Sequence, residues 1–204
     1  MRIATLSLLT ILCLALSATA FAGTLYNNGP TNGTSDAYFI DVYAVSDSFT
    51  VSPHATMTGF TFAEWALPGD TPLSVDWSVG TTSFGSTYSG VASGATFSTT
   101  LLGSAAFGYD LWNTTVIGGG NLSASSTWYL TLTGATDSGG GRDGWDINSG
   151  PSLAYHNTLG AVPSESFTIN GSEGGGTTPE PSSILLFGSG ILGLTGVLRR
   201  KMNR

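Results

Sequence analysis

The stretch Leu73-Ser74-Val75-Asp76-Trp77-Ser78-Val79 alternates apolar and polar residues along its whole length. Successive side chains of a β-strand point to opposite faces, so Val75, Trp77 and Val79 would share one apolar face. An antiparallel sheet can bury one face and leave the other in water. We therefore expect a strand whose Val75, Trp77 and Val79 side chains lie in a protein core.

The same alternation recurs on both sides of this stretch. Phe60 and Phe62 would share one face, and Trp128, Leu130 and Leu132 would share another. Between residues 23 and 178 no stretch shows the 3.6-residue apolar period of an amphipathic helix. Strands are predicted over residues 37–43, 48–51, 55–63, 73–79, 95–101, 106–115, 127–133 and 166–169, with weaker candidates at 24–26 and 153–156.

Many short strands separated by Gly, Pro, Asn and Asp are typical of a β-sandwich. The regularly placed aromatic residues argue against a disordered chain. We predict an all-β fold over residues 23–170, a two-sheet antiparallel sandwich of jelly-roll-like type. The Gly-rich residues 171–178 are predicted to form a flexible linker.

The N-terminal residues 1–22 have the pattern of a secretory signal peptide. Arg2 is followed by an apolar run from Leu6 to Leu16, and Ala20 and Ala22 supply a small-x-small cleavage site. A cleavage after Ala18-Thr19-Ala20 and an uncleaved anchor are the alternatives. The pattern predicts export of the chain.

The C-terminal tail has three parts in a fixed order. Pro179-Glu180-Pro181 precedes the uncharged residues 182–198, and Arg199, Arg200 and Lys201 follow. Seventeen helical residues span roughly 25 Å, slightly less than a hydrocarbon core of about 30 Å. We predict a transmembrane helix over 182–198 with a cytoplasmic C-terminus, because basic residues stay on the cytoplasmic side. A buried core helix is the alternative.

This tail, residues 179–204, resembles the PEP-CTERM protein-sorting signal of Gram-negative bacteria, with Thr178 where Val often stands. The resemblance implies that an exosortase-type membrane enzyme recognises Pro179, Glu180 and Pro181 and removes the tail. It also implies an inner-membrane intermediate, a final location at the cell surface or outside the cell, and an association with exopolysaccharide. The β-rich middle domain is similar to the regions that often precede such tails, and that similarity implies no activity.

The charge of the predicted mature region, residues 23–178, is strongly lopsided. Arg142 is its only Lys or Arg against twelve Asp and Glu, which gives a formal net charge of −11. Nucleic acid and anionic lipid are excluded as partners, because phosphate binding needs clustered basic residues. Most of the acids must be solvated, hydrogen-bonded to backbone donors or bound to a metal ion.

The same region offers little material for catalysis. It has no Cys and no Lys, and its only histidines are His54 and His156. A pair of carboxyl groups would serve glycoside hydrolysis, but no feature selects a pair among the twelve. We predict no catalytic residue and expect a non-catalytic surface or matrix protein. A secreted carbohydrate-active enzyme and a purely structural surface component are the alternatives.

One segment, residues 137–150, concentrates polar side chains beside a Trp in a Gly-rich stretch. Oxygen ligands on a flexible backbone suit Ca²⁺, although EF-hand spacing and its bidentate Glu are absent. A Trp face with hydrogen-bonding neighbours would also suit a sugar ring. A solvated loop in which Arg142 pairs with an Asp is the third interpretation, and no metal site is assigned. The candidate residues for a glycan or Ca²⁺ site are Asp137, Asp143, Trp145, Asp146 and Asn148.

Overall fold

The computed structural model of the protein describes residues 23–173, which form two antiparallel sheets and only two single-turn 3₁₀ segments, Gly94–Thr96 and Ala106–Gly108. The prediction of an all-β fold with two antiparallel sheets is confirmed. No helix in these residues has the length and apolar character needed to cross a membrane. The predicted signal peptide, transmembrane helix and sorting residues lie outside the described residues.

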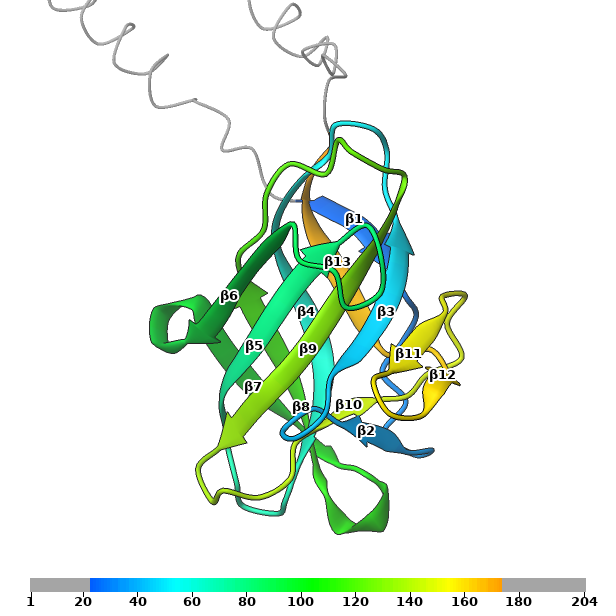
Figure 1. Cartoon of the computed structure of the whole chain (residues 1–204). Coiled ribbons are helices and arrows are strands. Elements are labelled where there is room, and N and C mark those ends of the chain that lie inside the picture. Colours follow the sequence, from blue (N-terminus) through cyan, green and yellow to red (C-terminus); the bar gives the residue numbers. More distant parts are fainter. Residues whose placement is uncertain (1–22, 174–204) are drawn as a thin grey trace, which may run out of the picture. The chain divides into compact units, whose positions relative to one another are not determined.

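The first sheet has seven strands, and β4 is its centre (Figure 1). β4 pairs with β8 along one edge, while β13 and then β10 occupy successive parts of its other edge. β1 lies outside β13, β2 outside β10 and β7 outside β8. The strands of this sheet are β1 (Gly23–Asn27), β2 (Ala37–Phe39), β4 (Thr56–Ala66), β7 (Phe97–Ser104), β8 (Asp110–Ile117), β10 (Gly144–Asp146) and β13 (Phe167–Ser172).

The second sheet has six strands in the order β12-β11-β3-β9-β5-β6. Its strands are β3 (Val45–Thr50), β5 (Pro72–Gly80), β6 (Tyr88–Ser93), β9 (Thr127–Asp137), β11 (Ala154–His156) and β12 (Gly160–Val162). The chain crosses between the sheets from β3 to β4 and again from β4 to β5. The longer strands therefore form β1-β13-β4-β8 against β3-β9-β5-β6.

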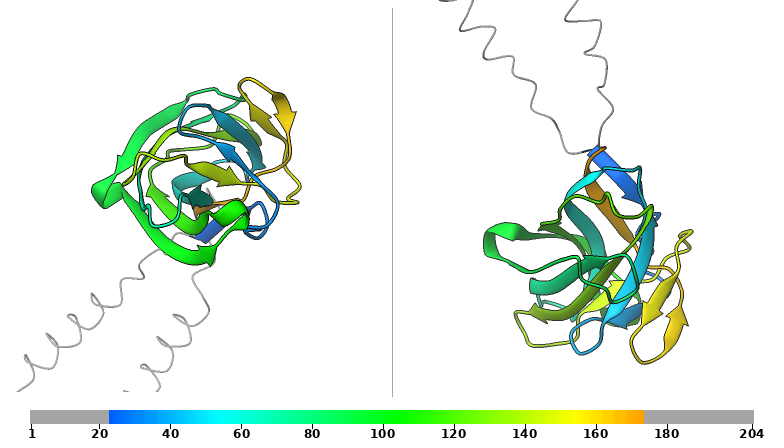
Figure 2. Two further views of the ribbon diagram at one scale, coloured as in Figure 1. Left: turned by 90° about the horizontal axis from the view of Figure 1, so that it is seen from below. Right: turned by 45° about the horizontal axis from the view of Figure 1, so that its top comes forward.

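The strands of the two sheets surround a common interior in the view from below in Figure 2, and the buried core residues lie between the sheets. The faces predicted from alternation are all buried: Val75, Trp77 and Val79 on β5, Phe60 and Phe62 on β4, and Trp128, Leu130 and Leu132 on β9. The rings of Phe60 and Trp77 meet edge-on across the sheets, with centroids 6.0 Å apart. Apolar burial of this kind is the main source of stability in a domain that has no disulfide.

Several boundaries differ from the sequence expectation. β6, β10 and β12 were not predicted, because β10 and β12 have only three residues each and β6 has no clear apolar alternation. Residues 106–108, predicted to be part of a strand, form a 3₁₀ turn that precedes β8. β13 continues through Ser172, so Gly171 and Ser172 pair with β4 in the range expected to begin the linker.

Candidate functional site

The segment predicted to carry the site, residues 137–150, is a solvated loop only in part, because residues 138–142 are largely exposed whereas residues 143–148 are buried. Asp137 ends β9, and Gly144–Asp146 is β10, which hydrogen-bonds to β4 on one side and to β2 on the other. Trp145 has no exposed surface, and its indole Nε1 donates to the Ser166 carbonyl at 2.9 Å. The prediction that Trp145 offers a face to a sugar is therefore wrong, because β10 turns this side chain into the core against Phe62 and Phe167.

Asp146 and Asn148 already have partners within the protein. The Asp146 carboxylate accepts from the backbone N–H groups of Asn32 at 2.7 Å and Gly33 at 2.8 Å, and from Trp65 Nε1 at 2.8 Å. The Asn148 amide donates to the Asn28 carbonyl at 2.7 Å. These two side chains hold the backbone around residues 28–33, so the structure separates them from the other candidates.

Asp137 and Asp143 belong to a different group of carboxyls, here called the Glu64 cluster: Asp41, Glu64, Asp137 and Asp143. Each member has at least one buried oxygen with no hydrogen-bond partner, and Asp143 has two. Thr114 Oγ1 donates to Glu64 Oε2 at 2.6 Å, and the N–H groups of Gly139 and Gly141 both donate to Asp137 Oδ1 at 2.9 Å.

Burial, together with the charges of Asp137, Asp41 and Asp70, raises the pKa of Asp143 to about 7. Burial also raises the pKa of Glu64 well above its ordinary value, with Asp143 and Asp137 adding to the effect. The neighbouring carboxylates thus disfavour the charged forms of Glu64 and Asp143. Of the four, only Asp137 and Asp143 were candidates from the sequence.

A second group of buried polar side chains, the Asn28 cluster, consists of Asn28, Asp47, Ser152, Ser164 and Glu165. Asn28 Nδ2 lies 2.7 Å from the hydroxyl oxygens of both serines. The backbone N–H groups of Glu165 and Ser48 donate to the two Asp47 oxygens at 2.7 and 2.6 Å. Here most acceptors meet a donor, and the Glu165 carboxyl is the exception.

Burial raises the pKa of Asp47 to about 6, although its hydrogen bonds act in the opposite direction. Burial raises the pKa of Glu165 well above its ordinary value, and the charge of Asp47 raises it further. Neither residue was a candidate from the sequence, because the cluster forms only when β1, β3 and the segment before β13 come together.

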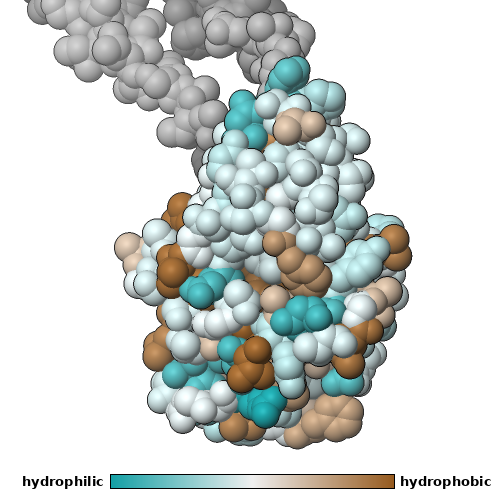
Figure 3. Space-filling model, in the orientation of Figure 1, coloured by the Kyte–Doolittle hydropathy of each residue, from teal (hydrophilic) through white to brown (hydrophobic). Residues whose placement is uncertain are grey.

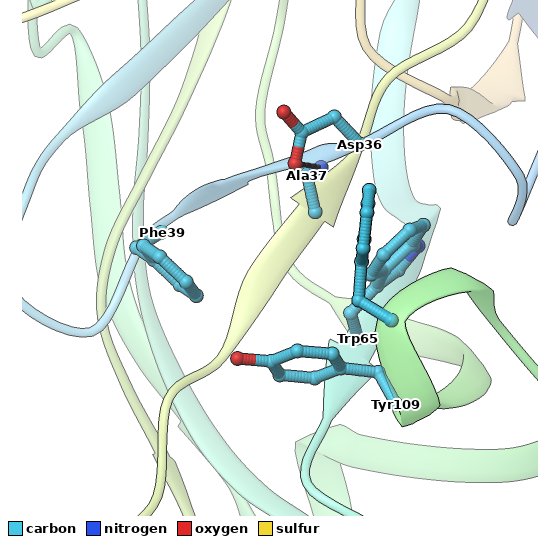
Figure 4. A pocket seen from close by; sticks show the side chains of 6 residues that line it. Asp36, Ala37, Phe39, Trp65 and Tyr109 are labelled. Carbon is cyan, nitrogen blue, oxygen red and sulfur yellow. Dashed lines mark hydrogen bonds between the residues drawn. The ribbon is translucent and has the colours of Figure 1, made fainter.

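A surface pocket of about 290 Å³ lies where β2, β4 and the 3₁₀ turn before β8 meet (Figure 4). Its lining residues are Asp36, Ala37, Phe39, Trp65, Phe107 and Tyr109. In Figure 4 Phe39 stands on one side, and Tyr109 and Trp65 lie on the other. The Trp65 ring centroid is 5.9 Å from that of Tyr109 and 6.4 Å from that of Phe107. We call this the aromatic pocket.

Two features shape the rim of the aromatic pocket. Phe107 is 76 % exposed and has a left-handed backbone with φ of 56°, which is rare for a bulky residue. The Arg142 guanidinium lies over the Phe39 ring, 5.0 Å from its centroid, in a cation–π contact. Arg142 therefore supports an aromatic side chain of the pocket, a role that the sequence interpretation did not foresee.

The surface also differs between its two halves. In Figure 3 the upper half of the face is mostly pale, whereas strongly hydrophilic and strongly hydrophobic residues lie side by side in the lower half.

Residues 177–201 match the PEP-CTERM protein-sorting motif. The matched range contains Pro179, Glu180 and Pro181 and ends with Arg199, Arg200 and Lys201, so the resemblance seen in the sequence is confirmed. No curated protein and no solved structure was found to match the chain. The PEP-CTERM motif marks the chain for export and for membrane-associated sorting by an exosortase.

The PEP-CTERM motif leaves the role of the β-domain open, because the match lies wholly outside residues 23–173. The chemistry of that domain must therefore come from its own side chains. Within residues 23–173, the aromatic pocket is a surface feature with ligand-sized volume and aromatic faces, whereas Glu64, Asp143, Asn28 and Glu165 are buried.

Proposed function

We propose that this chain is a PEP-CTERM surface protein whose β-domain is a non-catalytic glycan-binding module that works in exopolysaccharide. Residues 1–22 export the chain as a cleaved signal peptide, and a transmembrane helix over 182–198 holds it in the inner membrane. An exosortase then removes the tail, and the domain passes to the cell surface or the surrounding matrix. The matched motif supports the sorting steps, and the order of apolar and basic segments supports the anchor.

The sorting steps are tested with two epitopes, one in the β-domain and one after Arg204, in a host that carries the sorting enzyme. The domain epitope should appear outside the cell, separate from the tail epitope. Replacing Pro179, Glu180 and Pro181 with Ala should keep the intact chain in the inner membrane. Intact native chain with both epitopes in the inner membrane would show that the tail is only a single-pass anchor.

The aromatic pocket is the observation that carries the glycan-binding part. Sugar rings have apolar C–H faces, and ligand sites are mostly apolar with a few well-placed polar groups. Phe107 and Tyr109 supply ring faces, while the Tyr109 hydroxyl and Asp36 supply hydrogen-bonding groups at the same pocket. Trp65 is fixed beneath them because Asp146 holds its Nε1 at 2.8 Å. This arrangement is preorganised for a ring-shaped polar ligand.

The position of the carboxyls supports a non-catalytic role. Glycoside hydrolysis requires two carboxyl groups on opposite sides of the scissile bond. Asp36 is the one carboxyl that lines the aromatic pocket, while Glu64, Asp143, Asp47 and Glu165 are enclosed by protein. A sugar bound in the pocket would therefore meet a single acid.

The binding experiment is retention of the full chain on a panel of immobilised polysaccharides. Phe107→Ala and Tyr109→Ala should each weaken retention roughly tenfold, because one aromatic contact contributes about 1.5 kcal/mol. Phe84→Ala is the matched control, since Phe84 also has a left-handed backbone, with φ of 60°, and lies outside the pocket.

Equal retention of all variants would reject the pocket as the binding site. New reducing ends in the panel would support the carbohydrate-active enzyme instead. Absence of binding to every polysaccharide would favour a purely structural surface component.

A further inference from the structure

We propose that the Glu64 cluster is a binding site for a divalent cation, Ca²⁺, inside the sandwich next to β4. Glu64, Asp137 and Asp143 supply the central carboxylates, and Asp41 completes the group. This site differs from the one predicted from the sequence in two ways. Asp146 and Asn148 are excluded, because they are hydrogen-bonded to other parts of the protein, and Glu64 is included.

The backbone brings the four residues to one place. Trp145 of β10 pairs with Glu64 of β4, so Asp143 stands two residues before the partner of Glu64. The Ile40 N–H donates to the Asp143 carbonyl at 2.9 Å, and the Ala135 N–H donates to the Ile40 carbonyl at 3.1 Å. These two bonds tie the segments that carry Asp41, Asp137 and Asp143 to one another.

The carboxylates face the interior with unused oxygens. Glu64 and Asp143 have no exposed surface, yet Glu64 Oε1 and both oxygens of Asp143 have no hydrogen-bond partner. Asp137 Oδ2 and Asp41 Oδ1 are also buried and have no hydrogen-bond partner. A buried carboxylate oxygen without a partner is costly, so five of them in one cluster point to a missing positive group.

The protein itself does not provide that positive group. Arg142 is the only Lys or Arg in residues 23–173, and its guanidinium lies over the Phe39 ring. Protonation can neutralise part of the cluster, and the raised pKa of Asp143 is consistent with this route. A bound divalent cation would neutralise it at neutral pH and satisfy several oxygens at once.

The ligand chemistry favours Ca²⁺ among the common metal ions. Four carboxyl groups contribute only oxygen ligands, which suit hard cations, and Ca²⁺ accepts six to eight such ligands in flexible geometry. Zinc prefers nitrogen and sulfur ligands, which these four residues do not have.

In residues 23–173 no three His, Cys, Asp or Glu side chains already stand at metal-binding spacing. Binding must therefore draw the carboxylates inward. The segment that would move, between Asp137 and Asp143, contains Gly139, Gly140 and Gly141 and has the backbone freedom to do so.

The test is a thermal melt of the full chain, stripped of metal with EDTA, against increasing CaCl₂. At a Ca²⁺ concentration about 100-fold above Kd, the melting temperature should rise by roughly 5–10 °C. Glu64→Gln and Asp143→Asn should remove this rise. Glu165→Gln is the matched control, because Glu165 is equally buried and unpartnered but belongs to the Asn28 cluster, and it should keep the full rise.

A second measurement guards against misfolded variants. Tb³⁺ that replaces Ca²⁺ should give Trp-sensitised emission, since Trp112 is the cross-strand partner of Glu64. Emission should fall when Ca²⁺ is added and should be absent in Glu64→Gln, whose circular dichroism should match that of the native chain. No shift with CaCl₂, or a shift that both cluster variants keep, would overturn the proposal.

Discussion

The Asn28 cluster and the Glu64 cluster both contain buried acids, yet their carboxylates differ in how many hydrogen-bond donors they receive. In the first, Asp47 accepts from two backbone N–H groups and lies within reach of the Asn28 amide at 3.2 Å. In the second, Thr114 and two glycine N–H groups serve Glu64 and Asp137, and Asp143 receives no donor at all.

The difference shows two solutions to one problem. A domain with a single Arg must stabilise its buried acids with dipoles, protons or an added cation. The Asn28 cluster uses dipoles and joins β1 to β3 and to the segment before β13. The Glu64 cluster has few dipoles, so it depends on protonation or on an ion from outside.

Replacement of Asn28 by Leu should have the largest effect. It leaves Asp47 and two serine hydroxyls without their shared donor, so the free energy of unfolding should fall by about 3–5 kcal/mol, as for other broken buried networks. Urea denaturation measures this change. The exposed neighbour Asn27 provides the control: Asn27→Leu should cost less than about 1 kcal/mol, and equal costs would mean that the cluster does not hold the fold together.

The stability of the domain should fall as the pH rises from about 4 to about 7. Asp47 titrates near 6 in the folded state and near 3.8 when unfolded, so the folded state binds more protons in this interval. The stabilisation is fully present below the unfolded pKa and is lost as the pH rises through about 6. A shift of about two units corresponds to roughly 3 kcal/mol.

The comparison variant for the pH profile is Glu165→Gln. Glu165 and Tyr26 are the titratable neighbours of Asp47, and Asp146 and Asp36 act on Glu165 in turn. Without the Glu165 carboxyl, the loss of stability over the same pH interval should become smaller, because Glu165 also has a raised pKa. Identical profiles for native protein and variant would show that Glu165 does not contribute to the pH dependence.

Thr114→Val should have a smaller effect, in the Glu64 cluster. The substitution keeps the side-chain shape and removes the hydroxyl that donates to Glu64 Oε2 at 2.6 Å. One lost buried hydrogen bond should cost about 1–2 kcal/mol in urea denaturation. A cost as large as that of Asn28→Leu would show that the Glu64 cluster has a dipole network as important as the other one.

The smallest effect is expected at a residue outside both clusters. Phe107 is 76 % exposed and has a left-handed backbone that glycine adopts without strain. Phe107→Gly should leave the free energy of unfolding within about 1 kcal/mol of the native value. This variant sets the baseline for the other changes, and a loss above about 2 kcal/mol would mean that the aromatic pocket contributes to folding.

Period-two alternation was enough to predict most of the long strands and the buried faces of β4, β5 and β9. β10 was not predicted, because its three residues show no alternation. Its conformation is determined by tertiary pairing with β2 and β4. The interpretation of Trp145 failed for the same reason, since its burial depends on strands far away in the sequence.

Two of the four carboxyls of the Glu64 cluster, Asp137 and Asp143, were predicted from the sequence. Glu64 follows Phe60 and Phe62 at two-residue spacing, so the same alternation that puts the two rings in the core also puts a carboxyl there. A charged residue in the core-facing register is the signal that would have added Glu64 to Asp137 and Asp143. Asn28 gives no such signal, because its two serine partners come from segments more than 120 residues away.

β13 ends at Ser172, opposite Thr56 at the start of β4, while the aromatic pocket includes Trp65 near the other end of the same strand. If the domain grips a polymer at the pocket and is pulled through its C-terminal strand, the force runs along the length of β13 and β4. Their ladder of hydrogen bonds would then be loaded in shear, so that the bonds resist together instead of opening one by one. In that case the fold would bear tension between Ser172 and a ligand held at the far end of β4.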